Sequence, residues 1–193
     1  NNYDINTNLY TKEACLERAY GFAPDYMRLD ILYRNGGIYL DTDVEIIKPL
    51  DDLLYQEAFC GVEKWQTLNF GGCSGAQKGS KAIKAFLDAR ENIHFKREDG
   101  SLNMDTCGLI DTRTAIAMGY ELNGKLQNLS GMTIYPYDFF HPYDYMSGRL
   151  HKTCNTFSIH HFNGGWLNEE LRKENELIAE KYTLLEKRAS NFE

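Results

Sequence analysis

The stretch GGIYLDTDVEII at residues 36–47 constrains the fold of this chain more than any other. Two glycines precede an apolar run, and Asp41 and Asp43 follow it with one residue between them. Such an apolar run is typical of a strand that is covered on both faces of a sheet. Because side chains alternate across a strand, Tyr39, Asp41 and Asp43 are expected to share one face. Two carboxylates would then converge at the end of a buried strand.

The remaining pattern predicts strands that alternate with helices, which is typical of an α/β domain with GGIYL as a central strand. Pro24 suits the first turn of a helix, Gly36 and Gly37 suit its end, and Ser80 suits a helix cap. We expect helices at residues 11–20, 24–35, 81–92, from Asp111 or Thr112 to near Gly119, and 168–189, and strands at 38–47, 132–135 and 156–162. The buried stripe of the last helix is expected to be Leu171, Leu177, Ile178, Leu184 and Leu185.

Charge and length exclude several classes of protein. The chain has 193 residues and a net charge of -7, so it lacks the basic surface that nucleic-acid binding requires. No run approaches the roughly 20 apolar residues that cross a bilayer. The five cysteines form no C-x-x-C pair, which favours a reducing cytoplasm over a zinc or disulfide framework. We expect one domain over residues 1–193, without a nucleic-acid partner.

The acidic pair by itself is compatible with two interpretations. Asp41 and Asp43 offer the hard oxygen ligands that suit Mg²⁺ or Mn²⁺, but aspartates are also common in surface turns. The preceding helix places Asp25 and Arg28 one turn apart, and these two residues also have two interpretations. They are either an ordinary i, i+3 ion pair or part of the same site as the aspartates.

Residues 23–54, APDYMRLDILYRNGGIYLDTDVEIIKPLDDLL, resemble the signature of the family 32 DXD-containing glycosyltransferases. This family includes fungal Golgi mannosyltransferases and bacterial capsular-polysaccharide sugar transferases, and the pattern is also similar to that of the large clostridial glucosylating toxins. A second patch, IYPYDFFHP followed by NTFSIHHFNGGWL, resembles the capsular branch. Together the two patches extend the resemblance from about Tyr10 to Leu167.

The resemblance implies a GT-A fold, a Rossmann-like sheet that holds a nucleotide-diphosphate sugar with Mn²⁺ or Mg²⁺. Asp43 would be a direct metal ligand, and Asp41 would contact the metal or the ribose. Tyr39 would lie near the donor, and Asp25 and Arg28 would hold the sugar hydroxyls or the diphosphate. A UDP-sugar is favoured over a GDP-sugar as the donor.

The second patch supplies further site residues by the same resemblance. His161 would complete the metal shell, Gly164 would offer its backbone N–H to phosphate, and Trp166 would reach the diphosphate. His160 and His161 should lie on opposite faces of a strand, so only one of them can be the ligand. Gly165 departs from the family, which usually has Ser or Ala before the tryptophan, and this puts the donor affinity in question.

The implied reaction is transfer of the sugar to a glycan or lipid-linked acceptor with retention of anomeric configuration. Asn69 and Asp105 are candidates for a polar residue near the anomeric carbon, and each is equally suited to a turn. The family has a strand upstream of the residues that match Asn1, so we expect the domain to be N-terminally incomplete. A peripheral membrane position stays open, although the mixed charges of the last helix favour packing on the core.

Two other functions also fit parts of the pattern. A strand followed by D-x-D opens the haloacid-dehalogenase phosphatases, whose first aspartate is a nucleophile. Asp51 and Asp52 come too soon to be the second acidic pair of those enzymes, and the second patch would have no role. A carbohydrate-binding or scaffold protein without catalytic activity is the other alternative.

Overall fold

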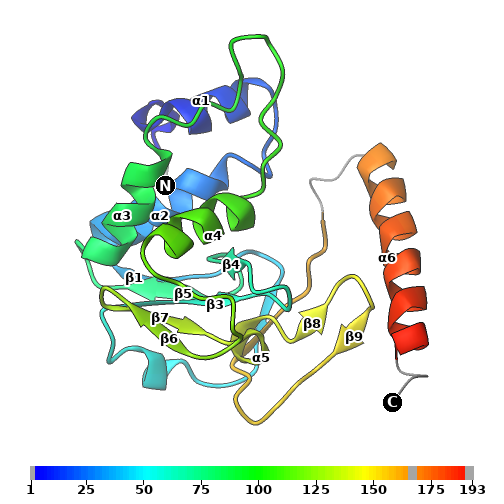
Figure 1. The fold of residues 1–193 in the computed structure, drawn as a ribbon. Coiled ribbons are helices and arrows are strands. Elements are labelled where there is room, and N and C mark those ends of the chain that lie inside the picture. The colour runs from blue at the N-terminus through cyan, green and yellow to red at the C-terminus, as the bar shows by residue number, and fades with distance from the viewer. Residues whose placement is uncertain (1–2, 165–168, 190–193) are drawn as a thin grey trace.

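The computed structural model describes residues 3–164 and 169–189 of the chain (Figure 1). Its helices are η1 (Ile5–Thr7), α1 (Leu9–Leu16), α2 (Pro24–Asn35), η2 (Asp51–Leu53), α3 (Lys81–Arg90), α4 (Cys107–Ala117), α5 (Tyr137–Phe140) and α6 (Glu169–Ala189). Its strands are β1 (Gly37–Tyr39), β2 (Val44–Ile46), β3 (Ala58–Val62), β4 (Leu68–Asn69), β5 (Ser74–Ala76), β6 (Gln127–Leu129), β7 (Met132–Tyr135), β8 (Tyr143–Asp144), β9 (Arg149–Leu150) and β10 (Ser158–His160). The mixed α/β class expected from the sequence is confirmed.

The main sheet has the order β1-β5-β3-β7-β6, with β4 paired to β3. β3 and β7 are parallel, with Ala58 opposite Met132, and the other pairs of this sheet are antiparallel. All five residues of β3 are buried, whereas Gly37 of β1 is exposed. The prediction that GGIYL forms a central strand is therefore wrong, because β1 lies at the edge and β3 is the strand covered on both faces.

Helices α2, α3 and α4 lie on one side of the main sheet in Figure 1. Leu29 and Leu32 of α2 pack in one buried cluster with Ile83, Phe86 and Leu87 of α3 and with apolar residues of β3 and β7. Ile83, Phe86 and Leu87 are spaced i, i+3 and i+4, so they form one buried face of α3. The Ser80 side chain accepts a hydrogen bond from the Ile83 N–H, as a helix cap should.

The ends of three elements differ from the prediction. α1 stops at Leu16, and Arg18 then has a positive φ of 59°, which ends the helical path. α4 begins at Cys107 with Thr106 as its cap, so Asp111 lies inside the helix and forms a buried ion pair with Arg90 at 2.7 Å. β10 is shorter than the strand expected at residues 156–162, since Phe162 has a φ of 50°.

The acidic stretch is divided between two strands. β1 ends at Tyr39 and β2 begins at Val44, so Asp41 and Asp43 lie in the intervening turn. The prediction of one continuous strand is wrong, and alternation along a strand does not bring these carboxylates together. β2 instead pairs antiparallel with β10, with Val44 opposite His160. This pairing brings the carboxyl-terminal part of the chain to the turn.

Helix α6 begins and ends near the predicted bounds but does not bury the predicted stripe. The side chains of Leu177, Ile178, Leu184 and Leu185 are between 48% and 62% exposed, and that of Leu171 lies outside the described side chains. α6 contacts the body through Tyr182, which accepts a hydrogen bond from Lys64 and packs edge-on against Trp65. Among the described residues, no helix combines the length and the apolar character needed to cross a lipid bilayer.

Candidate functional site

Two carboxylates and one imidazole converge where the β1–β2 turn meets β10. One ligand atom each from Asp41, Asp43 and His160 lies within 4.8 Å of the others. His160 Nε2 is 3.2 Å from Asp43 Oδ1 and 4.0 Å from Asp41 Oδ2. The imidazole is buried, while the carboxylates are about one quarter and one fifth exposed, at 25% and 20%. The group therefore faces solvent on the side of the aspartates.

The backbone after His160 wraps around Asp43. The N–H of His161 donates to the carbonyl of Asp43 at 3.1 Å, and the N–H of Asn163 donates to Asp43 Oδ2 at 2.9 Å. The positive φ of Phe162 lets the chain fold back in this way, a conformation that is uncommon for a bulky residue and is often found at functional sites. Its ring stacks on His160 with centroids 4.0 Å apart.

His160 is poised to act as a neutral ligand. Burial lowers the pKa of His160 below its usual value, while the nearby Asp43 and Asp41 oppose this change. The neutral imidazole has a lone pair for a metal, which the protonated ring lacks. Two carboxylates with one neutral imidazole form a donor set that fits Mn²⁺ or Mg²⁺.

His161, the imidazole expected in the metal shell, lies elsewhere. Its Nε2 is 3.1 Å from Glu45 Oε2, and both side chains are about half exposed, at 44% and 56%. Alternation along β10 turns neighbouring side chains to opposite sides, so His161 lies on the face that contacts Glu45, while His160 contacts the aspartates of the turn before β2. The geometry therefore favours His160 over His161 as the candidate ligand.

Buried Asp25 and Arg28 and half-buried Tyr39 form a network beside Asp41. Arg28 Nη2 is 3.3 Å from Asp25 Oδ1, and Arg28 Nη1 is 3.7 Å from Asp41 Oδ2. The guanidinium lies over the Tyr39 ring, and the Tyr39 hydroxyl donates to Asp41 Oδ1 at 2.8 Å. Burial raises the pKa of Asp25 to about 6, although Arg28 opposes the change. These side chains, predicted from the first patch, are thus brought together.

Asn69 lies next to this network, but its amide is bonded within the protein. Its Oδ1 accepts from the N–H groups of Gly71 and Gly72 at 2.7 and 3.2 Å, and its Nδ2 donates to Glu63 Oε1 at 2.8 Å. The Gly71 carbonyl in turn accepts from the Asp41 N–H at 2.8 Å. These contacts give Asn69 a role in shaping the turn behind Asp41, while contact with a substrate stays a prediction.

The other predicted residues are not joined to the cluster by any contact that the described residues show. Asp105 pairs with Arg113 at 3.3 Å on the surface and lines a hollow between α3 and α4. The Gly164 carbonyl accepts a hydrogen bond from Arg172 at 2.8 Å. Trp166 lies outside the described residues.

Glu63 and His141 were not found from the sequence. Glu63 directly follows β3, and burial raises its pKa to about 7, against the opposing hydrogen bonds of Asn69 and Thr67. His141 is buried 5.8 Å from His160, measured between ring centroids, and burial holds its pKa well below the usual value. The histidine before the proline in IYPYDFFHP could have pointed to His141, whereas Glu63 is recognised only by its contacts in the folded chain.

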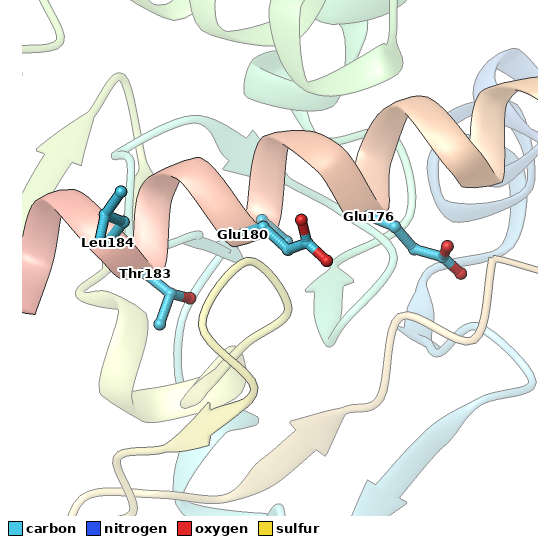
Figure 2. A pocket seen from close by; sticks show the side chains of 5 residues that line it. Glu176, Glu180, Thr183 and Leu184 are labelled. Carbon is cyan, nitrogen blue, oxygen red and sulfur yellow. The ribbon is translucent and has the colours of Figure 1, made fainter.

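A further hollow lies along α6, and its lining residues differ from those of the Asp41, Asp43 and His160 group. Figure 2 shows Glu176, Glu180, Thr183 and Leu184 along the helix where they border it. No member of the Asp41, Asp43 and His160 group lines this hollow. We therefore place the candidate site at the three-residue group.

Comparisons with known proteins support a transferase. Residues 5–60 match the family model of the glycosyltransferase sugar-binding region containing DXD motif. This range includes Asp25, Arg28, Tyr39, Asp41 and Asp43, and the match supports a place for the chain among the DXD glycosyltransferases.

Two curated proteins are similar over shorter ranges. Subversion of eukaryotic traffic protein A of Legionella pneumophila is 30% identical over 98 residues, which cover 49% of this chain and 15% of that protein. Glucan organizing enzyme 1 of Cryptococcus neoformans is 49% identical over 39 residues, which cover 20% of this chain and 11% of that protein. The matches thus span less than a sixth of either relative's length. No solved structure matches.

Proposed function

We propose that this chain is a metal-dependent, retaining glycosyltransferase that moves a sugar from a nucleotide-sugar donor to a glycan or lipid-linked acceptor. The convergence of Asp41, Asp43 and His160 beside buried Arg28 supports this proposal most strongly. The family match covers the two aspartates and Arg28, while His160 comes from a distant part of the chain. The proposal includes a GT-A fold, with which the mixed α/β sheet is compatible.

In this proposal Asp41, Asp43 and His160 hold Mn²⁺ or Mg²⁺. The ion would stabilise the negative charge that grows on the leaving diphosphate. Arg28 adds a fixed positive charge at the same edge, and Asp25 holds the guanidinium in place. Tyr39 fixes the orientation of the Asp41 carboxylate through its hydroxyl. These residues therefore preorganise the site before a donor arrives.

The proposed transfer needs no dedicated base from the protein. The bond between the anomeric carbon and a diphosphate oxygen breaks, and the acceptor hydroxyl bonds to the same face of that carbon. The acceptor proton passes to the departing diphosphate. The buried network then acts by orientation and charge.

The finer parts of the proposal concern donor, product and location. We propose a UDP-sugar over a GDP-sugar and a product in polysaccharide biosynthesis of the capsular type. The five cysteines are all free thiols in the structure, which supports action in a reducing cytoplasm, with a peripheral membrane position for a lipid-linked acceptor. The matches to the two relatives cover too little of their length for the roles of those proteins to be assigned to this chain.

A screen of nucleotide sugars by thermal shift, with Mn²⁺, Mg²⁺ or EDTA, tests the proposed function. We expect one UDP-sugar to raise the melting temperature only when a divalent ion is present. NMR of the reaction should then show transfer or slow hydrolysis of that donor with retention. Glycan binding without nucleotide affinity would support the scaffold, and phosphate release from simple esters would support the phosphatase.

A further inference from the structure

Glu63 lies at the start of a tight loop that connects β3 to β4. Its N–H donates to the Thr67 carbonyl at 2.9 Å, and its own carbonyl accepts from the Gln66 N–H at 2.8 Å. The next residue, Lys64, forms an ion pair with buried Asp144 at 2.8 Å. Glu63 is therefore on a rigid hairpin at the carboxyl end of the central strand, where α/β sheets place their ligands.

The contact between Glu63 and Asn69 selects one orientation of the Asn69 amide. Above its pKa of about 7, Glu63 is an ionised carboxylate that only accepts hydrogen bonds, so Nδ2 of Asn69 faces it in the 2.8 Å contact. Oδ1 then faces the other way and accepts from Gly71 and Gly72. With the amide reversed, the NH₂ group would oppose both backbone N–H groups.

The turn that Asn69 holds contacts both segments that bear the candidate ligands. The Gly71 carbonyl accepts from the Asp41 N–H at 2.8 Å. The Gly72 carbonyl accepts from the Ser158 hydroxyl at 3.2 Å, and Ser158 starts the strand that ends at His160. A Cβ added at Gly71 would collide with the carboxylate of Asp41, so the turn and this carboxylate are close-packed.

We propose that Glu63 is a positioning residue of the metal centre, which fixes the Asn69 amide and through it the turn that supports Asp41 and His160. This inference rests on the proposed function, because it requires that Asp41, Asp43 and His160 bind a divalent ion. Outer residues that orient metal ligands typically affect metal affinity by about 10–100-fold when they are replaced.

An exchange of the hydrogen-bond donor and acceptor between positions 63 and 69 tests the proposal in the full chain. Mn²⁺ affinity is measured at pH 8 from the electron paramagnetic resonance signal of the free ion, without any sugar donor. Asn69→Asp places a second carboxylate against Glu63, and we expect Mn²⁺ affinity to fall roughly tenfold. Glu63→Gln combined with Asn69→Asp restores a hydrogen bond in the reverse direction, so the double variant should regain most of the affinity. Glu63→Gln alone should stay near the wild type, because its amide oxygen still accepts from Asn69.

Two controls separate positioning from folding. Glu91→Gln, at an exposed glutamate, should leave Mn²⁺ affinity unchanged. Melting temperatures of all variants show whether each is folded at the temperature of the Mn²⁺ measurement, and a merely structural role would change those temperatures without a change in Mn²⁺ affinity. Unchanged affinity in Asn69→Asp, or a double variant no better than that single variant, would overturn the proposal.

Asp43→Ala, measured alongside, distinguishes the role of Glu63 from the existence of the metal centre. If Asp43→Ala loses Mn²⁺ and the exchange series shows no effect, the role of Glu63 is rejected and the proposed function stands. If Asp43→Ala binds Mn²⁺ like the wild type, the metal centre itself is rejected, and the role of Glu63 with it.

Discussion

The imidazole of His160 lies 3.2 Å from the carboxylate of Asp43, although the two residues are far apart in the sequence. The antiparallel pairing of β10 with β2 produces this contact, since it sets His160 opposite Val44, the residue next to Asp43. Asn163 then closes the chain over the same carboxylate through its N–H. One strand pair thus assembles a candidate metal centre from two distant segments.

Replacement of His160 by alanine should weaken Mn²⁺ binding by at least about tenfold, because even residues one step further from a metal have effects of this size. His161→Ala is the matched control, since its ring is 44% exposed and contacts Glu45 instead of the aspartates. Isothermal titration with Mn²⁺ measures both variants. A larger loss for His161→Ala than for His160→Ala would return the assignment to His161.

Arg28→Met should lower the free energy of unfolding by about 3–5 kcal/mol, because it leaves the carboxylate of Asp25 buried without its partner. Arg113→Met is the comparison variant: Arg113 pairs with Asp105 at 3.3 Å, and the two side chains are 65% and 41% exposed. Such a pair is worth about 0–1 kcal/mol. Urea unfolding of the two variants measures the difference, and equal losses would contradict the buried network.

Gly71→Ala should reduce both stability and Mn²⁺ affinity. A Cβ at this position would collide with the carboxylate of Asp41 and lie 2.9 Å from Arg28 Nη1. Overpacking of this kind costs about 1–3 kcal/mol. Gly108→Ala, whose Cβ would lie 3.2 Å from the nearest atom, the Leu68 carbonyl, should cost less and leave Mn²⁺ binding intact. Normal Mn²⁺ binding by Gly71→Ala would contradict the proposed support of the metal site by this turn.

The pH dependence of stability should include a contribution from Glu63. Burial raises its pKa in the folded chain from 4.5 to about 7. Between these values the folded state binds more protons than the unfolded state, so this contribution to stability is full below about pH 4.5 and is lost as the pH rises through 7.

Glu63→Gln should remove this part of the slope, and Glu91→Gln should leave it unchanged. Urea unfolding in EDTA from pH 4.5 to 8 gives the slope for each variant. A slope in Glu63→Gln as steep as in the wild type would show that Glu63 titrates alike in both states.

Much of the local structure could be predicted from the sequence, because local chemistry determines it. Pro24 at the first turn and Gly36 with a φ of 72° delimit α2, and Ser80 caps α3. The position of β1 could not be predicted in this way. Its apolar run resembles a central strand, but the central position belongs to β3, and only tertiary pairing decides between them.

The part of the site that comes from residues 25–43 could be predicted from the sequence, whereas the part that comes from β10 and Glu63 could not. Asp25, Arg28, Tyr39, Asp41 and Asp43 belong to one continuous motif, and a helix followed by a strand and turn brings them together. The choice between His160 and His161 depends on the register of β10 against β2, because a shift of one residue exchanges the faces. No feature of the sequence marks Glu63, because burial causes its raised pKa and its contact with Asn69 forms only in the folded chain.

Isothermal titration of a UDP-sugar into the wild type and Asp43→Ala, each with Mn²⁺ and with EDTA, tests the central claim most directly. If Asp43 holds an ion that bridges to the diphosphate, the wild type binds the donor far more tightly with Mn²⁺, and Asp43→Ala shows little difference between the two conditions. If Asp43→Ala instead binds the donor with the same dependence on Mn²⁺ as the wild type, the account of this site is wrong.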